Sequence, residues 1–92
     1  MNGSRTYFTY MVRCADGSLY TGYTVDSIEK RVEVHNQGKG SKYTRSRLPV
    51  TLAWYESFHT EHEARSLEYH LKKKSKKEKE ALAASFGKDR KE

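Results

Sequence analysis

Apolar and polar residues alternate along the first part of the chain, and this alternation predicts an antiparallel β-hairpin. Aromatic and aliphatic side chains take every second position between Tyr7 and Cys14, which is the period of a β-strand. The sequence Ala-Asp-Gly-Ser at 15–18 is typical of a turn, in which Gly17 is free to adopt a positive φ angle. Residues 19–24 then predict the returning strand, and residues 50–58 predict a third strand.

Helical spacing of apolar residues and three capping signals predict three helices. A capping residue followed by glutamate three positions later opens each of them: Asp26 with Glu29, Thr60 with Glu63, and Ser75 with Glu78. We expect the first helix to end before Gly38, the second to continue to about residue 73, and the third to end near Gly87. The stretch 36–48 has two glycines and no apolar period, so it predicts a loop.

The predicted order of elements is ββαβαα, which indicates a small α+β domain. We expect a three-stranded antiparallel sheet with helices covering one face. The helical residues predicted to provide the cover are Ile28, Val32, Ala64, Leu67, Leu71, Ala81 and Leu82. A chain of 92 residues forms one hydrophobic core, so we expect a single domain over 1–92, with its core at about 6–84 and a frayed tail at 88–92.

Composition narrows the class of protein. The chain has no apolar run long enough to span a membrane and no apolar signal-peptide region, so we expect a cytoplasmic protein without a membrane partner. A single cysteine, Cys14, excludes an internal disulfide and a thiolate zinc cluster. Seven tyrosines argue against disorder.

The net charge of +6 is unevenly distributed and predicts binding to a polyanion. Residues 36–55 carry four basic side chains and no acidic one, and a second basic stretch begins at residue 72. A solvated lysine-rich helix is the simpler explanation for the second stretch taken alone. The candidate nucleic-acid-binding residues are Lys39, Lys42, Tyr43, Arg45, Arg47, Lys72, Lys73, Lys74, Lys76 and Lys77.

Polar side chains at positions that favour burial are the candidates for chemistry. Glu68 lies within the apolar stripe of the second helix, where a carboxylate needs a cation or a divalent metal. An ion pair with Arg31 or Arg65, or a place at the solvent-exposed edge of the apolar stripe, would also account for Glu68. Arg31 and His35 are four residues apart and share a helix face, suited to phosphate binding and proton transfer. A surface arginine and a helix-terminal histidine are the alternative.

The hairpin places two tyrosines on one face of the predicted sheet. Tyr10 and Tyr20 lie on adjacent strands, so that their phenols can converge, although packing at the rim of a core is the usual role of a strand tyrosine. Gly22 lies inside the second strand and often indicates a bulge or a close approach of the backbone.

These residues together resemble the GIY-YIG nuclease domain over residues 6–84. The similarity rests on the Phe-Thr-Tyr sequence at 8–10, the Tyr-Thr-Gly sequence at 20–22, and the helical Arg31, His35 and Glu68. The runs 16–22 and 35–45 resemble the small stand-alone bacterial members more closely.

The resemblance implies metal-dependent hydrolysis of phosphodiester bonds by a catalytic set of Tyr10, Tyr20, Arg31, His35 and Glu68. It implies that Glu68 holds one Mg²⁺ or Mn²⁺ ion, that the tyrosines position or deprotonate the attacking water, and that Arg31 stabilises the phosphate. Two departures are Phe-Thr in place of Gly-Ile in the first motif and the lack of an asparagine beyond Glu68.

The expected substrate is nucleic acid, DNA rather than RNA, cut with low sequence specificity because no base-reading motif is present. With so short a chain, we expect specificity to be either minimal or supplied by a protein partner. The alternatives are a nucleic-acid-binding module that does not cut and an adaptor for an acidic protein partner.

Overall fold

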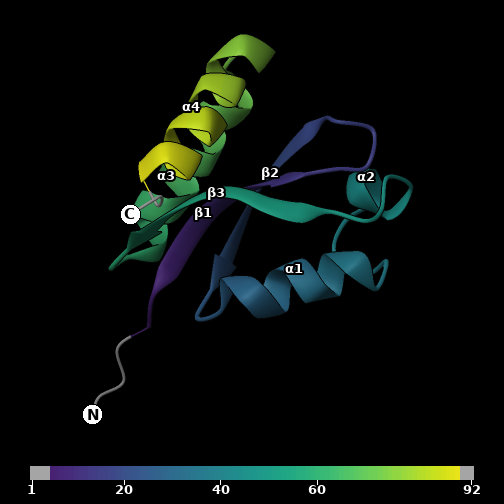
Figure 1. Ribbon diagram of the computed structural model, residues 1–92. Helices are drawn as coiled ribbons and strands as arrows, with labels where there is room; N and C mark the ends of the chain where they lie inside the picture. Colours follow the sequence, from purple (N-terminus) through teal and green to yellow (C-terminus); the bar gives the residue numbers. More distant parts are fainter. Residues whose placement is uncertain (1–4, 90–92) are drawn as a thin grey trace.

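The fold is that of a small α+β protein, as the sequence predicts, with the order ββααβαα (Figure 1). We describe residues 5–89 of a computed structural model, with side chains through residue 86. The elements are β1 (Tyr7–Arg13), β2 (Leu19–Val25), α1 (Ile28–Asn36), α2 (Lys42–Arg45), β3 (Thr51–Phe58), α3 (Glu61–Lys72) and α4 (Lys76–Asp89). Helix α4 includes residues 88 and 89, which were expected to be frayed; residues 90–92 of that expected tail lie outside the described residues.

Strand β1 is the centre of the three-stranded antiparallel sheet, whose order is β2-β1-β3. Tyr10 lies opposite Gly22 on β2, and Val12 lies opposite Tyr20. Side chains of paired residues lie on the same face of a sheet. Tyr10, Val12 and Tyr20 therefore share one face, and β2, which carries Tyr20, is an edge strand.

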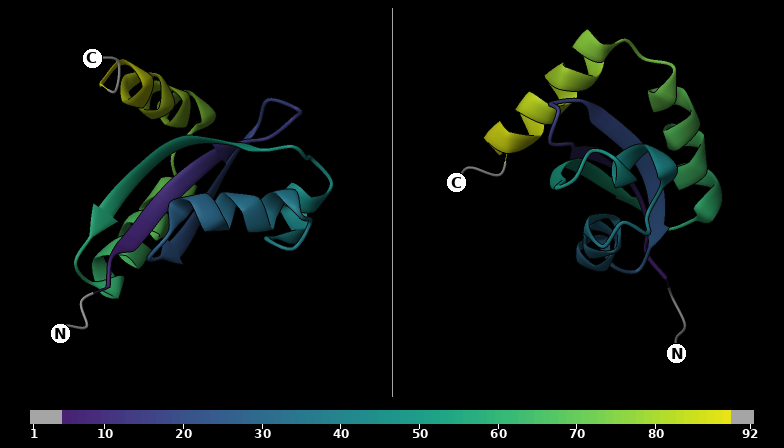
Figure 2. Two further views of the ribbon diagram at one scale, coloured as in Figure 1. Left: turned by 60° about the horizontal axis from the view of Figure 1, so that its bottom comes forward. Right: turned by 90° about the vertical axis from the view of Figure 1, so that its right-hand side faces the viewer.

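Helices cover both faces of the sheet, whereas the sequence predicted cover on one face only (Figure 2). On one face Tyr10 and Val12 pack with Ile28 of α1. On the other face Met11 and Trp54 pack with Leu71 of α3 and with the partly buried Leu67, Leu82 and Phe86. The central strand has large side chains on both faces, so each face requires cover. Ala81, predicted to be part of the cover, is exposed.

Local capping explains where the helices begin. The predicted capping pairs at the starts of α3 and α4 are confirmed: the hydroxyl oxygens of Thr60 and Ser75 accept hydrogen bonds from the backbone N–H of Glu63 and Glu78. The capping residue of α1 is Ser27, whereas the sequence predicted Asp26. Asp26 does not take the extended backbone of a capping residue, because its φ is positive, at 72°.

The loop predicted at 36–48 contains the short helix α2, which lies next to the end of α1 (Figure 1). The side chain of Ser41 caps this helix by accepting from the backbone N–H of Thr44 at 3.1 Å. A single turn has no room for an apolar period, which is why the sequence pattern did not reveal it.

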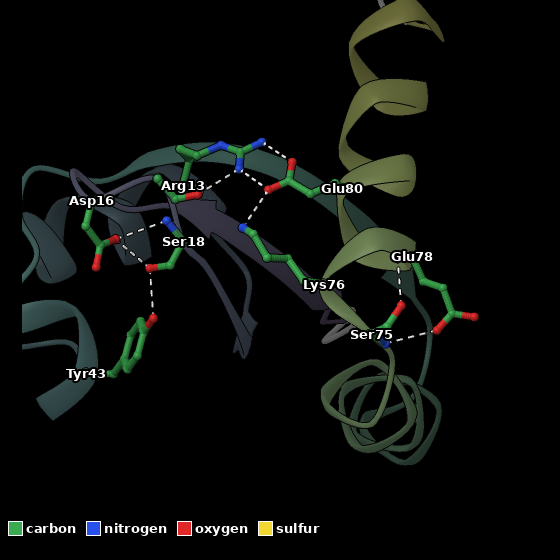
Figure 3. A network of polar contacts seen from close by, with 9 residues as sticks. Arg13, Asp16, Ser18, Tyr43, Ser75, Lys76, Glu78 and Glu80 are labelled. Carbon is green, nitrogen blue, oxygen red and sulfur yellow. Dashed lines mark hydrogen bonds and ion pairs between the residues drawn. The ribbon is translucent and has the colours of Figure 1, made fainter.

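An ion-pair network fixes α4 against the hairpin turn (Figure 3). Arg13 makes two hydrogen bonds to Glu80, from Nη1 to Oε2 at 2.5 Å and from Nη2 to Oε1 at 2.8 Å. Arg13 also donates to the carbonyl oxygen of Gly17, and Lys76 pairs with Glu80 at 3.3 Å. Within the described residues, no helix is both long and apolar enough to span a membrane.

Candidate active site

Three of the predicted catalytic side chains form one hydrogen-bonded cluster between β1 and α1. The hydroxyl group of Tyr10 lies 2.7 Å from Nε2 of His35. Arg31 donates from Nε to the same hydroxyl oxygen at 3.2 Å and from Nη2 to the carbonyl oxygen of Gly40 at 3.1 Å. The residues are 21 and 25 positions apart in the chain, and the packing of α1 on the Tyr10 face of the sheet brings them together.

His35 is fully buried at the centre of this cluster. Its second ring nitrogen, Nδ1, lies 2.8 Å from Oγ1 of Thr44 on α2, a residue that is also fully buried. Burial, and secondarily the positive charge of Arg31, lower the pKa of His35 to about 4. The imidazole is therefore neutral near pH 7 and can accept one hydrogen bond while donating another.

Gly40 allows the loop to close on His35. A β-carbon at position 40 would lie 2.1 Å from Nδ1 of the imidazole, closer than any side-chain atom tolerates. A residue with a side chain would push the loop away from both His35 and Arg31. Glycine is thus required at position 40 by the close approach of backbone and ring.

Tyr10 is the buried phenol of the pair. Its exposed fraction is only 1%, and burial raises the pKa of its hydroxyl, while the hydrogen bond and charge of Arg31 oppose the rise. The negative charge of Glu68 also contributes to the increase, which places that carboxylate within electrostatic range of Tyr10.

Tyr20 is the more accessible phenol and is held by other rings. Its ring contacts the imidazole of His35 edge-on, with centroids 5.5 Å apart, and stacks on Tyr43 of α2 at 5.8 Å. Tyr20 is half-buried, and among the described residues its hydroxyl has no hydrogen-bond partner. That hydroxyl is available to a water molecule or a substrate.

Tyr43 and Arg47, predicted to bind nucleic acid, make contacts within the protein. The guanidinium carbon of Arg47 lies 3.8 Å from the centroid of the Tyr43 ring, and the same ring stacks on Tyr20. The Tyr43 hydroxyl donates to Ser18 of the hairpin turn at 2.8 Å (Figure 3), and Arg47 pairs with Asp16 at 3.0 Å. Tyr43 is nevertheless 37% exposed, so part of its surface remains open to solvent.

Glu68 lies on α3, the helix that packs on the opposite face of the sheet from Tyr10. Its side chain is 19% exposed and pairs with Lys72 at 3.2 Å, and not with Arg31 or Arg65 as considered above. The ammonium of Lys72 lies 6.0 Å from the centroid of the Tyr20 ring. The carboxylate is therefore partly open to solvent, and its charge acts on Tyr10.

The remaining basic candidates lie on the surface. The exposed side chains are Lys39, Lys42, Arg45, Lys72, Lys73, Lys74, Lys76 and Lys77. Lys73 lies over the ring of Tyr69, at 4.5 Å from its centroid, and Lys76 pairs with Glu80. These cations lie in residues 38–47, called the basic loop below, and at the junction of α3 with α4.

The structure also identifies residues that sequence reasoning missed. Thr44 and Gly40 contact His35 directly. Both lie in the run 35–45 that resembles the small bacterial members, but nothing in the sequence gave either of them a role. Asn36 does not supply the missing asparagine, since its side chain is bonded to the backbone of Val50 in both directions, at 2.7 and 3.0 Å. The second asparagine, Asn2, lies outside the described residues.

Comparison with known proteins finds a family model that covers most of the chain. Residues 6–81 match the family described as the GIY-YIG catalytic domain. The chain is 53% identical over 77 residues to a UPF0213 protein of Bacillus licheniformis, a match that covers 84% of this chain and 78% of that protein.

Two solution NMR structures have the same fold. One is a UPF0213 protein of Bacillus halodurans, 40% identical, with a TM-score of 0.55; the match covers 86% of this chain and 83% of that one. The other is a protein of E. faecalis, 38% identical, with a TM-score of 0.59, covering 95% and 92% respectively. These names state no activity, so the relatives establish the family and not the reaction.

Proposed function

Because the chain belongs to the GIY-YIG family, whose domain spans residues 6–81 here, we propose that it is a nuclease that hydrolyses phosphodiester bonds with a divalent metal ion. The observation that carries the proposal is the hydrogen bond from Arg31 to Tyr10, in a cluster that also contains His35 and Tyr20. Such a cluster joins a phosphate-binding cation to groups that orient and transfer protons.

Arg31 is the group that binds the scissile phosphate. Two of its five N–H groups are used, by Tyr10 and by the carbonyl oxygen of Gly40. Among the described residues no carboxylate neutralises it, so its remaining N–H groups and its charge are available to an anionic ligand. A guanidinium held in this way stabilises the charge that develops on the phosphate during attack.

The two tyrosines have different roles. Tyr20 positions the attacking water, because its hydroxyl has no hydrogen-bond partner among residues 5–86 and its ring is held between His35 and Tyr43. Tyr10 is buried, and it orients Arg31 by accepting its Nε–H while its hydroxyl is also hydrogen-bonded to His35. We assign His35 to the same cluster: it is neutral near pH 7, so its ring accepts one hydrogen bond and donates another.

GIY-YIG nucleases typically use a divalent metal, and we assign its binding here to Glu68. Within the described residues no three histidine, cysteine or acidic side chains are grouped as metal ligands. A single carboxylate nevertheless fits Mg²⁺ or Mn²⁺, because such ions bind through one or two carboxylates and keep water and phosphate oxygens as other ligands. The ion would neutralise negative charge on the phosphate. The ion pair between Lys72 and Glu68 would have to break for the carboxylate to bind the metal.

The substrate we propose is DNA, cut with low sequence specificity. The basic loop and the α3–α4 junction supply cations that contact phosphates in any sequence, which positions a strand without reading its bases. Specificity for a particular structure or site would then come from the shape of the substrate or from a protein partner.

Cleavage assays test the proposal. The protein is incubated with single-stranded, duplex and branched DNA, and with the same sequences as RNA, in Mg²⁺, in Mn²⁺ or in EDTA. We expect metal-dependent cleavage, strongest on DNA. Glu68→Gln should lower the rate by about 100-fold or more, because an uncharged amide holds the metal poorly.

Glu61→Gln is the matched control. Glu61 lies on the same helix and pairs with Arg65 four residues later, as Glu68 pairs with Lys72. It should cut within about twofold of the wild type, because exposed ion pairs contribute little. Equal activity of the Glu68 variant and the wild type would show that the metal assignment is wrong.

A non-catalytic nucleic-acid-binding module is the second candidate, favoured by the lack of an available asparagine beyond Glu68. It predicts binding to the same DNA without cleavage in any metal. The two candidates are separated by measuring affinity and cleavage on the same preparation.

A further inference from the structure

A chain of hydrogen bonds runs from Arg31 through Tyr10 and His35 to Thr44, and the position of each proton in it follows from the contacts. Arg31 donates to the oxygen of Tyr10. The hydroxyl proton of Tyr10 has one acceptor within hydrogen-bond distance among the described residues, Nε2 of His35 at 2.7 Å. Since Tyr10 is buried, a hydroxyl proton without an acceptor would be costly. Nε2 is therefore the nitrogen that carries no proton.

A neutral imidazole with a bare Nε2 carries its proton on Nδ1. Nδ1 lies 2.8 Å from Oγ1 of Thr44, which accepts this proton. The hydroxyl proton of Thr44 then turns to Ser41, whose side-chain oxygen is 2.9 Å away and whose carbonyl oxygen is 3.4 Å away. The opposite arrangement, in which Thr44 donates to Nδ1, would leave the Tyr10 proton buried without an acceptor. Only the first arrangement gives a partner to every polar group in this series of hydrogen bonds.

We propose that Thr44 is a positioning residue of the active site: its hydroxyl holds His35 in the Nδ1-protonated tautomer and thereby, through Tyr10, orients the guanidinium of Arg31. The last link rests on the proposed function, in which Arg31 binds the scissile phosphate. The assignment of the tautomer does not depend on that function.

The packing of the loop supports this role for Thr44. Gly40 covers the same nitrogen of His35, with no space for an added β-carbon, and its carbonyl oxygen holds Nη2 of Arg31. Thr44 and His35 are both fully buried, so solvent does not replace the threonine hydroxyl. The loop thus contacts this series of hydrogen bonds at two points, His35 and Arg31.

A buried threonine in a one-turn helix also has a simpler explanation, as part of the local structure of α2. Ser41 separates the two explanations. Its Oγ accepts from the backbone N–H of Thr44 and caps α2, while His35 bonds to Thr44 and not to Ser41. A purely structural role predicts that Thr44→Val and Ser41→Ala act alike on the site, whereas a positioning role predicts that only the threonine variant changes His35.

The first test reads the tautomer directly. The ¹⁵N chemical shifts of the His35 ring are measured by NMR at pH 7, on the full chain without metal or nucleic acid. In the wild type we expect a protonated Nδ1 and an unprotonated Nε2. Thr44→Val should move the proton to Nε2 in a measurable fraction of molecules, Thr44→Ser should restore the wild-type pattern, and Ser41→Ala should keep it. A wild type protonated on Nε2 overturns the proposal, even if Thr44→Val does not fold.

The second test reads the consequence for cleavage. Thr44→Val should lower kcat by about tenfold with KM almost unchanged, a loss typical of residues that orient a catalytic group, and Thr44→Ser should recover most of it. An unchanged tautomer in Thr44→Val, or an equal change in Ser41→Ala, would refute the positioning role. A wild type that has the assigned tautomer but cuts no substrate refutes the proposed function. It does not contradict the hydrogen bond by which Thr44 holds the tautomer of His35.

Discussion

The hydroxyl of Tyr10 fills the space that a side chain at Gly22, on the adjacent strand, would occupy. The two residues are directly paired, and a β-carbon at position 22 would lie 2.5 Å from the hydroxyl oxygen of Tyr10. The glycine in the second motif therefore serves the tyrosine in the first, because any side chain there would displace the hydroxyl that Arg31 and His35 bind.

Gly22→Ala should disable the site while leaving the fold. The added methyl group shifts the Tyr10 hydroxyl away from Arg31 and His35, and a displacement of this kind costs about 100-fold in rate. We expect that loss in the cleavage assay, with circular dichroism showing the native content of strand and helix. Thr24→Ala, on the same strand and face, is the control and should cut normally. A Gly22→Ala enzyme with wild-type rate would show that Tyr10 does not need its present position.

His35 should make stability depend on pH between 6.5 and 4. The unfolded chain takes up a proton near the ordinary pKa of 6.5, whereas the folded protein does so only at about 4. The contribution of neutral His35 is therefore complete above pH 6.5 and is lost as the pH falls to 4, by at most about 3 kcal/mol.

Urea unfolding at pH 7, 6 and 5 measures this dependence. The wild type should lose stability across the series more steeply than His35→Gln, which cannot titrate. The difference between the two proteins removes the contribution of the other histidines, His59, His62 and His70. Parallel curves would contradict the prediction.

The Arg13–Glu80 pair should anchor α4. Its two hydrogen bonds join β1 to the last helix, and the bond to Arg13 is the main reason that the pKa of Glu80 is lowered to about 2. Glu80→Gln should lower the Tm by a few degrees, and Lys76→Met by less, since it leaves the Arg13 pair intact. The stabilisation by Glu80 is present above pH 4.5 and is lost as the pH falls toward 2. Thermal unfolding at pH 7 and pH 3 measures both effects.

Lys76 and Lys79 should contribute to nucleic-acid binding. With Ser18 and Leu19 they line a cavity of about 180 Å³ between the hairpin turn and α4, and Arg13 already neutralises Glu80 there. The affinity for DNA should fall with log salt at a slope of about −0.9 per phosphate contact. Replacing both lysines by alanine should reduce that slope by up to about 2.

Arg5→Ala is the control for this measurement. Arg5 pairs with Asp26 at the opposite end of the hairpin, so its loss should leave the slope almost unchanged. A wild-type affinity that does not depend on salt would instead favour the adaptor for a protein partner.

Local signals in the sequence were sufficient for most of the fold. The two-residue alternation of β1 and the turn around Gly17, whose φ is 88°, identified the hairpin. The capping pairs at Thr60 and Ser75 identified the starts of α3 and α4. These signals are readable because each depends on residues within a few positions of one another. The prediction of Asp26 as the cap of α1 was wrong because the neighbouring Ser27 is an equally good capping residue, and a local signal does not separate the two.

The candidate catalytic residues were identified from residue type and motif spacing, but their contacts were not. Arg31, His35 and Tyr10 are joined in the structure by hydrogen bonds across 21 to 25 positions. Tyr43 and Arg47 belong to the same basic loop as Lys39, yet they contact Tyr20 and Asp16 within the protein. Charge and residue type alone do not distinguish a side chain that binds a ligand from one that holds a neighbour.

The sequence by itself determined the hairpin, the three longer helices and the uneven positive charge, and it supplied the candidate catalytic side chains. Only the tertiary structure decided that both faces of the sheet are covered, that α2 exists, and that Thr44 contacts His35. The physical reason is the range of the interactions. Strand period and helix caps are local, whereas the burial of His35 and the direction of its protons depend on which distant segments pack around it.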